Sequence, residues 1–238
     1  MTQEQDSTRK KPNMQFFILV LLFCFSIFLF ALYRFSQDDF VFIRKAVSMD
    51  TIFNAAFSVS LISLMISRVF YIFSFPKPVF FTFLGSVLFP YFPGLSLIGS
   101  VFGGAIFLSI YCFYKKIPAG RMLDFFSESL LFTLPVGFIF IYLVGGRASY
   151  FLISFIFYII FLVSNIFIFH PLFTKGKIKD GALGLLFLSI FSLFTIIINI
   201  FTANLKFNYS LENIILFPGL IISLSLFIYK QFIARKSY

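Results

Sequence analysis

The run MQFFILVLLFCFSIFLFALY (14–33) contains no charged residue, and apolar side chains occupy every face of the helix it would form. A helix needs about 20 apolar residues to cross a hydrocarbon core of about 30 Å. Six further runs meet the same test: 51–73, 94–114, 122–144, 149–169, 182–204 and 211–230. Membrane-spanning strands would alternate apolar and polar residues, which these runs do not. The sequence therefore predicts an all-α integral membrane protein, a bundle of about seven transmembrane helices.

The overall composition supports this class. Of the 238 residues, 60% are hydrophobic and only 12% are charged, and the mean hydropathy is +1.01. Soluble domains carry about 25% charged residues, so this chain has too few polar side chains to cover the surface of a water-soluble protein of its size. That excludes an ordinary cytosolic enzyme, a secreted disulfide scaffold and a disordered chain. The net charge of +10 is attributed to cytoplasmic loops, and no nucleic-acid partner is expected.

The chain divides into two parts. Residues 1–13 are polar and are predicted to be a disordered tail, and residues 14–238 form a single transmembrane domain. Within it, the segment 74–93 places eleven apolar-rich residues between prolines, which is too short to cross a membrane. We expect this segment to be interfacial or re-entrant.

The distribution of Lys and Arg predicts the orientation. Twelve of these residues fall in the loops after the first, third and fifth helices and in the C-terminal tail, whereas six fall in the N-terminal tail and the other loops. Basic residues gather on the cytoplasmic side of membrane proteins. We therefore expect the C-terminus in the cytoplasm and the N-terminus outside.

Arg68 is the one basic residue inside a predicted span, where a charge costs about 2.5–3.5 kcal/mol on insertion scales. Two interpretations stay open. The side chain either extends to the outer membrane surface or binds a lipid phosphate, whose oxygens match the guanidinium fork.

Asp124 and Glu128 lie four residues apart and share one helix face. Arg121, three residues before Asp124, is expected to pair with it as an interfacial anchor. A paired-carboxylate acid–base site is the alternative. The sole histidine, His170, receives no role.

Cys24 and Cys112 lie inside apolar runs and show no metal-ligand spacing, so neither a disulfide framework nor a metal or other cofactor is predicted. The polar residues Asn54, Asn165, Thr195 and Asn199 are expected to form interhelical hydrogen bonds. Gly99 and Gly103, with Gly104 beside them, have the spacing of closely packed membrane helices.

The order of several segments resembles the prolipoprotein diacylglyceryl transferase family. The segments are SMDTIFNAAFSVSLISLMISRVFYIF (48–73), GLSLIGSVFGG (94–104), AGRMLDFF (119–126) and a helix containing Pro135 and Gly137. The resemblance implies seven spanning helices in the bacterial plasma membrane, with the N-terminus outside. It also implies transfer of diacylglyceryl from phosphatidylglycerol to a lipobox cysteine, so the implied partners are membrane phospholipid and lipoprotein precursors.

Most of the matching positions are scaffold positions. They are the SRVFY motif (67–71), Gly94, Ser96, Gly99, Gly103, Gly104 and Gly137, and the turn with Arg121 and Asp124. Arg68 and Arg147 remain as cations that could bind a lipid phosphate on the outer side. The glycines and Ser96 are expected to pack helices near the family's site.

The family's chemical positions are replaced. Ile98 stands where the family has a histidine, and Phe138 where it has an arginine. Thr195 and Asn199 stand where it has an arginine and a glutamate. The family reaction needs a thiolate, hence a base, and a cation for the departing glycerol phosphate. Isoleucine takes no proton and phenylalanine stabilises no phosphate.

Three functions therefore compete: a divergent active transferase, a non-catalytic relative that binds phospholipid or a lipoprotein precursor, and an unrelated small transporter or assembly subunit. The replaced positions favour the family fold without the standard activity. On this reading, a cavity should open sideways to the outer leaflet beside Gly99, Phe138 and Arg68.

Overall fold

The computed structural model describes residues 14–76, 94–144, 149–202 and 211–233. The polar tail, most of the proline-bounded segment and Arg147 lie outside the described residues. Within the described ranges every regular element is a helix, as predicted.

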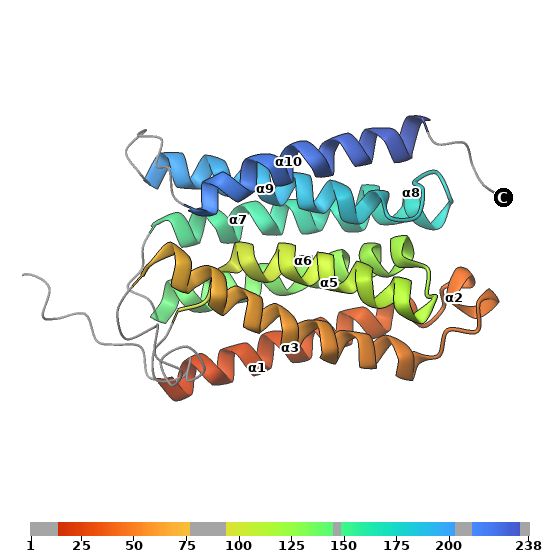
Figure 1. Ribbon diagram of the computed structural model, residues 1–238, viewed down its shortest axis with the longest axis horizontal. Coiled ribbons are helices and arrows are strands. Elements are labelled where there is room, and N and C mark those ends of the chain that lie inside the picture. Colours follow the sequence, from red (N-terminus) through yellow and green to blue (C-terminus); the bar gives the residue numbers. More distant parts are fainter. Residues whose placement is uncertain (1–13, 77–93, 145–148, 203–210, 234–238) are drawn as a thin grey trace, which may run out of the picture.

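The helices run back and forth along one axis (Figure 1). They are α1 (Met14–Ser36), α2 (Phe40–Arg44), α3 (Met49–Ser74), α5 (Leu97–Lys115), α6 (Ala119–Val144), α7 (Ser149–Ser164), η2 (Asn165–Phe169), α8 (His170–Thr174), α9 (Ala182–Thr202), α10 (Leu211–Ile228) and η3 (Tyr229–Ile233). Among the described residues, seven helices are long and apolar enough to cross a membrane, in agreement with the seven runs.

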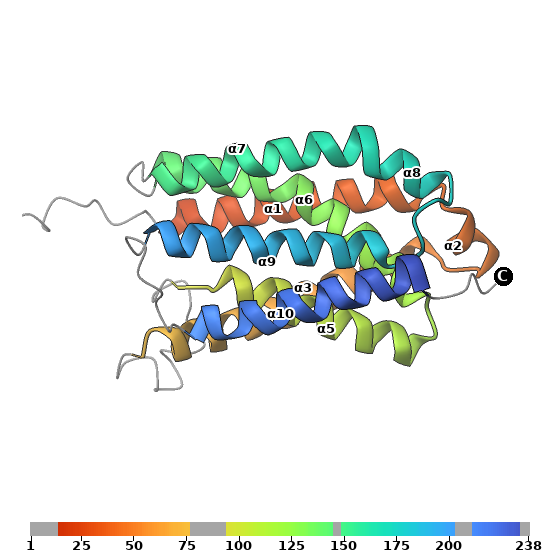
Figure 2. The same cartoon turned by 90° about the horizontal axis from the view of Figure 1, so that it is seen from above.

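The bundle has two distinct ends, and two views show which elements reach each of them (Figures 1 and 2). Helices α1, α5, α7 and α10 begin at one end, here called the Met14 end. Helices α3, α6 and α9 begin at the other, which carries α2 and α8 and is here called the α2 end. Helix α6 is central, because it packs against α1, α5, α7 and α9.

Two buried clusters form the core. The first lies near the α2 end and includes Leu32, Phe42, Met122 and the free thiol of Cys112. The second joins α5, α6, α7, α9 and α10 and is rich in aromatic side chains: Ile98, Val101, Leu131, Leu134, Tyr158, Phe161, Phe187, Leu188, Phe191, Ile196 and Leu216. The second cluster matters for function because it surrounds the largest cavity described below.

Helices α3 and α5 pack closely through small residues. A Cβ atom at Gly99 would lie 2.7 Å from the Cβ of Phe70 and 3.2 Å from the Cα of Ser67, and one at Gly103 would lie 2.5 Å from Ile66. The Ser67 hydroxyl donates to the Ser96 carbonyl at 2.8 Å. The predicted role of the glycine spacing in helix packing is confirmed.

Gly137 differs from these glycines. The nearest heavy atom to a Cβ at this position is the sulfur of Cys24, at 3.9 Å, which is an ordinary contact distance. The expectation that Gly137 packs helices closely is therefore wrong, because α1 leaves room for a side chain beside it.

These two glycines offer a matched test. Gly99→Ala should destabilise the protein by about 1–3 kcal/mol, because the new methyl meets a Cβ and a backbone atom that cannot rotate away. Gly137→Ala should be neutral or stabilise by up to about 1 kcal/mol through higher helix propensity. Thermal unfolding of the two purified variants measures both effects, and equal losses would contradict the assignment.

Candidate functional site

A cavity of about 390 Å³ lies between α5, α6, α7 and α9, near the Met14 end. We call it the chamber. Its volume falls in the range of about 300–1,000 Å³ that is typical of small-molecule sites. The described residues that line it are Leu97, Phe138, Tyr150, Phe151, Ser154, Tyr158, Phe194, Thr195, Ile198, Asn199 and Thr202.

One wall is a polar stripe on α7. Tyr150, Ser154 and Tyr158 follow one another at four-residue intervals, so a regular helix places them on one face. The Ser154 hydroxyl donates to the Tyr150 carbonyl at 2.8 Å, and the Tyr158 hydroxyl lies close to the Thr195 side chain of the facing wall.

The facing wall is a second polar stripe, on α9. Thr195, Asn199 and Thr202 are spaced four and three residues apart, which also keeps them on one face. The Thr195 hydroxyl donates to the Phe191 carbonyl at 2.7 Å. The Asn199 amide donates to the Asn213 side-chain oxygen at 2.9 Å, which ties α9 to α10.

Aromatic rings close the space between the stripes. Phe138 stacks on Tyr158 with ring centroids 5.4 Å apart, and Phe194 meets the same tyrosine edge-on at 5.5 Å. Phe194 also stacks on Phe157 at 3.7 Å. The described lining is therefore amphipathic: apolar carbon with neutral hydroxyl and amide groups, and without an ionised side chain.

The positions singled out by the family resemblance meet here. Phe138, Thr195 and Asn199 line the chamber, and Ile98 is buried in the aromatic cluster against which Phe138 packs. The prediction of one cavity beside Gly99, Phe138 and Arg68 is met only at Phe138. The described lining includes neither Gly99 nor Arg68, which lie on the α3–α5 side.

Arg68 is 5% exposed. Its Nη1 donates to the Gly94 carbonyl at 2.8 Å, and its guanidinium lies 5.8 Å from the centre of the Tyr71 ring. Gly94 has φ +155°, and the Tyr71 ring occupies the space that a side chain at Gly94 would need. These contacts fasten the segment that enters α5 to the end of α3. A side chain extended to the surface, one of the two readings of Arg68, does not fit this burial.

The expected pair of Arg121 with Asp124 is wrong. Arg121 Nη2 lies 2.6 Å from Asp39 Oδ2, and Nη1 lies 2.8 Å from Asp180 Oδ1. Its guanidinium also covers the Phe173 ring at 3.9 Å. Arg121 therefore connects α6 with the start of α2 and with the turn before α9.

Asp124 accepts hydrogen bonds from the backbone N–H groups of Gly181 and Gly184. The first amides of a helix have no partner within it and favour a negative charge. Asp124 thus caps α9, an outcome that spacing along α6 alone could not indicate. Glu128 contacts Asn165 and His170 instead, so the two acids have separate partners and do not form a shared carboxylate site.

Sequence reasoning missed the α7 wall of the chamber. A signal existed, because Tyr150, Ser154 and Tyr158 place oxygen atoms on one face of an otherwise apolar helix. It also assigned no role to His170, whose Nδ1 lies 2.9 Å from Glu128. That contact depends on the helix geometry described below.

Comparison with protein-family models, curated proteins and solved structures returns no match for this chain.

The chamber predicts a difference in thiol reactivity between two positions on α9. In a background without Cys24 and Cys112, Thr195→Cys should react with a small neutral thiol reagent at least about tenfold faster than Ser192→Cys. Thr195 lines the chamber, whereas Ser192, three residues earlier, is 0% exposed. Reaction rates of the folded, purified variants measure this, and indistinguishable rates would mean that the chamber admits no reagent.

Proposed function

We propose that this chain is a membrane-embedded, lipid-binding relative of the prolipoprotein diacylglyceryl transferases that has lost the standard transfer reaction. The observation that carries the proposal is the convergence of Phe138, Thr195 and Asn199 on one cavity. Phe138 on α6 and the pair Thr195 and Asn199 on α9 are more than fifty residues apart in the sequence, and all three line the same space. Such convergence supports a shared binding site.

The chemistry of the lining favours binding over transfer. A thiol acceptor needs a base, and a departing phosphate needs a cation. The described lining offers aromatic rings, aliphatic side chains, hydroxyls and an amide. Such groups hold acyl chains by apolar contact and a glycerol backbone by hydrogen bonds, without activating either.

The exterior of the bundle supports a membrane location. Large apolar side chains point outward along its helices, among them Phe30 at 67%, Phe113 at 87% and Phe167 at 75% exposed. In water such a surface would drive aggregation, whereas a bilayer solvates it. The charge distribution supports placing the Met14 end, and with it the chamber, on the outer side of a bacterial plasma membrane.

The binding proposal is tested by filling the chamber. Ser154→Phe should reduce co-purifying phospholipid at least about tenfold in native mass spectrometry, because the new ring occupies the cavity. Ser109→Phe is the matched control, since Ser109 also donates to the carbonyl four residues earlier but lies on the exposed face of α5. Equal lipid retention in the two variants would contradict a lipid site in the chamber.

Loss of the transfer reaction has its own assay. The purified wild-type chain is incubated with phosphatidylglycerol and a lipobox peptide, and released glycerol phosphate is measured. We expect no release above the protein-free background. Turnover comparable to that of an active transferase would overturn this part of the proposal and leave the lipid site in place.

Orientation is tested by labelling intact cells. In a background without the native cysteines, a membrane-impermeant thiol reagent should label Ser149→Cys, at the Met14 end, and not Lys175→Cys, at the α2 end. Both positions are exposed. The reverse labelling pattern would show that the chamber faces the cytoplasm.

A further inference from the structure

Glu128 is a buried acid outside the chamber. Its side chain is 1% exposed, and Glu128 is the tenth residue of α6. Oε1 accepts a hydrogen bond from the Asn165 amide at 3.3 Å and lies 2.9 Å from Nδ1 of His170. Oε2 has no hydrogen-bond partner among the described residues. Buried carboxylates in apolar surroundings are costly and mark functional sites when helices span a membrane.

A widened helical turn brings both partners to Glu128. The His170 N–H donates to the Asn165 carbonyl five residues earlier, which closes the π-helical turn η2. In a regular α-helix, residues five apart lie about 140° apart around the axis. The wider turn places Asn165 and His170 on one side, facing α6. Single π-turns of this kind are frequent at functional sites.

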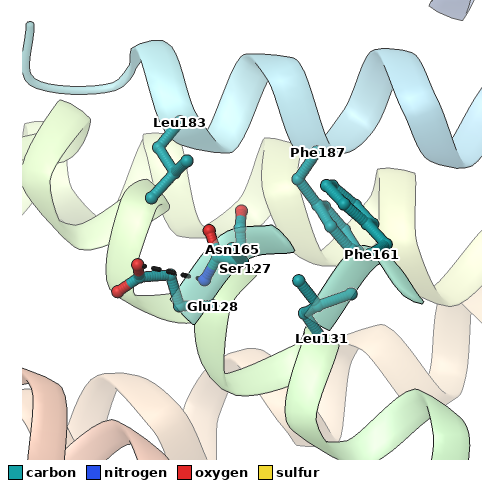
Figure 3. A pocket seen from close by; sticks show the side chains of 7 residues that line it. All are labelled: Ser127, Glu128, Leu131, Phe161, Asn165, Leu183 and Phe187. Atoms are coloured by element: carbon teal, nitrogen blue, oxygen red, sulfur yellow. Dashed lines mark hydrogen bonds between the residues drawn. The ribbon is translucent and has the colours of Figure 1, made fainter. Parts of the chain in front are cut away.

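The small space beside Glu128 shares no described lining residue with the chamber. A cavity of about 10 Å³, the size of about one water molecule, lies beside Glu128 and Asn165 (Figure 3). Phe161 and Phe187 line it, with stacked rings 6.3 Å apart. Along α7 and α9 these rings lie between Glu128 and the Tyr158–Thr195 contact of the chamber.

The other side opens toward the α2 end. The His170 side chain is 30% exposed, and its ring lies against Phe35 of α1 at 5.2 Å. Because Nδ1 faces Glu128, Nε2 occupies the opposite edge of the ring, where no described residue bonds it. His170 and Glu128 are in direct contact, yet the exposed fraction of the side chain falls from 30% at His170 to 1% at Glu128.

The charged side chains nearest to Glu128 and His170 are bound to other partners. From α6, Arg121 acts on His170 but is held by Asp39 and Asp180, and Asp124 caps α9. From η3, Lys230 approaches Gly120 and Gly181. The other immediate neighbours are uncharged: Phe35 from α1, Phe161 from α7, Asn165 from η2, and Leu183 and Phe187 from α9.

We propose that Glu128 and His170 form a proton-binding site that is loaded from the α2 end of the bundle. In the unloaded state a neutral imidazole donates its Nδ1 proton to the carboxylate, and the pair carries one negative charge. The incoming proton binds the free Nε2, so the pair becomes a neutral imidazolium–carboxylate ion pair with Nδ1–H still bonded to Oε1. Proton uptake thereby strengthens the link between α6 and the η2–α8 segment. This inference is independent of lipid binding in the chamber.

The single histidine makes the site directly observable. His170 is the only imidazole in the chain, so its ring nitrogen signals in a ¹⁵N-labelled, untagged sample need no assignment. We expect one protonation step in the wild type. In Glu128→Gln the step should move by at least about tenfold in proton concentration, because the opposite charge is removed. Asp50→Asn, at an exposed acid on α3, is the matched control and should leave the step unchanged.

The proposal would be overturned if His170 were protonated at the same proton concentration, within twofold, in the wild type and in Glu128→Gln. It would also be overturned if no protonation step were observed. If Glu128→Gln does not fold, the pH dependence of the unfolding temperature is compared between the wild type and His170→Gln. The site predicts a pH-dependent component that His170→Gln lacks. Identical pH curves would again reject the site.

Discussion

The Asp124 carboxylate at the start of α9 is the contact on which the rest of the arrangement depends. In an apolar bundle the first amides of a helix have no water to bond, so a buried helix start needs a partner from another element. Asp124 supplies it to Gly181 and Gly184, and the close approach of Gly184 to Leu123 follows from it. This joint fixes α9 against α6. Phe138, the α9 wall of the chamber and Glu128 all lie along that interface.

The two ends of the bundle differ in chemistry. At the α2 end, the single cation of Arg121 forms ion pairs with both Asp39 and Asp180, close to where α2 and α9 begin. Toward the Met14 end, the described lining of the chamber uses hydroxyls and an amide beside aromatic rings. The proposed lipid site and the proposed proton site therefore lie toward opposite ends of the bundle. An aromatic layer formed by Phe161, Phe187 and Phe191 lies between them.

Much of the fold could be predicted from the sequence, because a run of about 20 apolar residues has few alternatives to a membrane-spanning helix. The seven helices and the close approach at Gly99 and Gly103 follow from composition and spacing. The partners of polar residues did not follow. Arg121 and Asp124 are neighbours on α6, yet they bond to elements separated from them by more than fifty residues, and only the tertiary arrangement selects those partners over the nearer one.

The candidate sites show the same limit. The resemblance selected Phe138, Thr195 and Asn199, but the α7 stripe of Tyr150, Ser154 and Tyr158 became meaningful only when α7 was seen to face α9. The contact of His170 with Glu128 requires a helix that departs from regular winding. Pro171, which follows His170 and lacks an N–H, was the available hint, because it cannot continue the ladder of i to i−4 bonds.

The widened turn at Asn165–Phe169 holds one more residue than α-helical winding would place there. If that surplus moved past His170, the residues it passed would rotate by about 100° and shift by about 1.5 Å along the axis, whereas the helix on either side would keep its setting. His170 would then leave Glu128 while the upstream part of the span kept its setting. The contact between His170 and Glu128 on α6 thus fixes the direction in which the His170 side chain points. The extra residue of the η2 turn is what would allow that direction to change once the contact is broken.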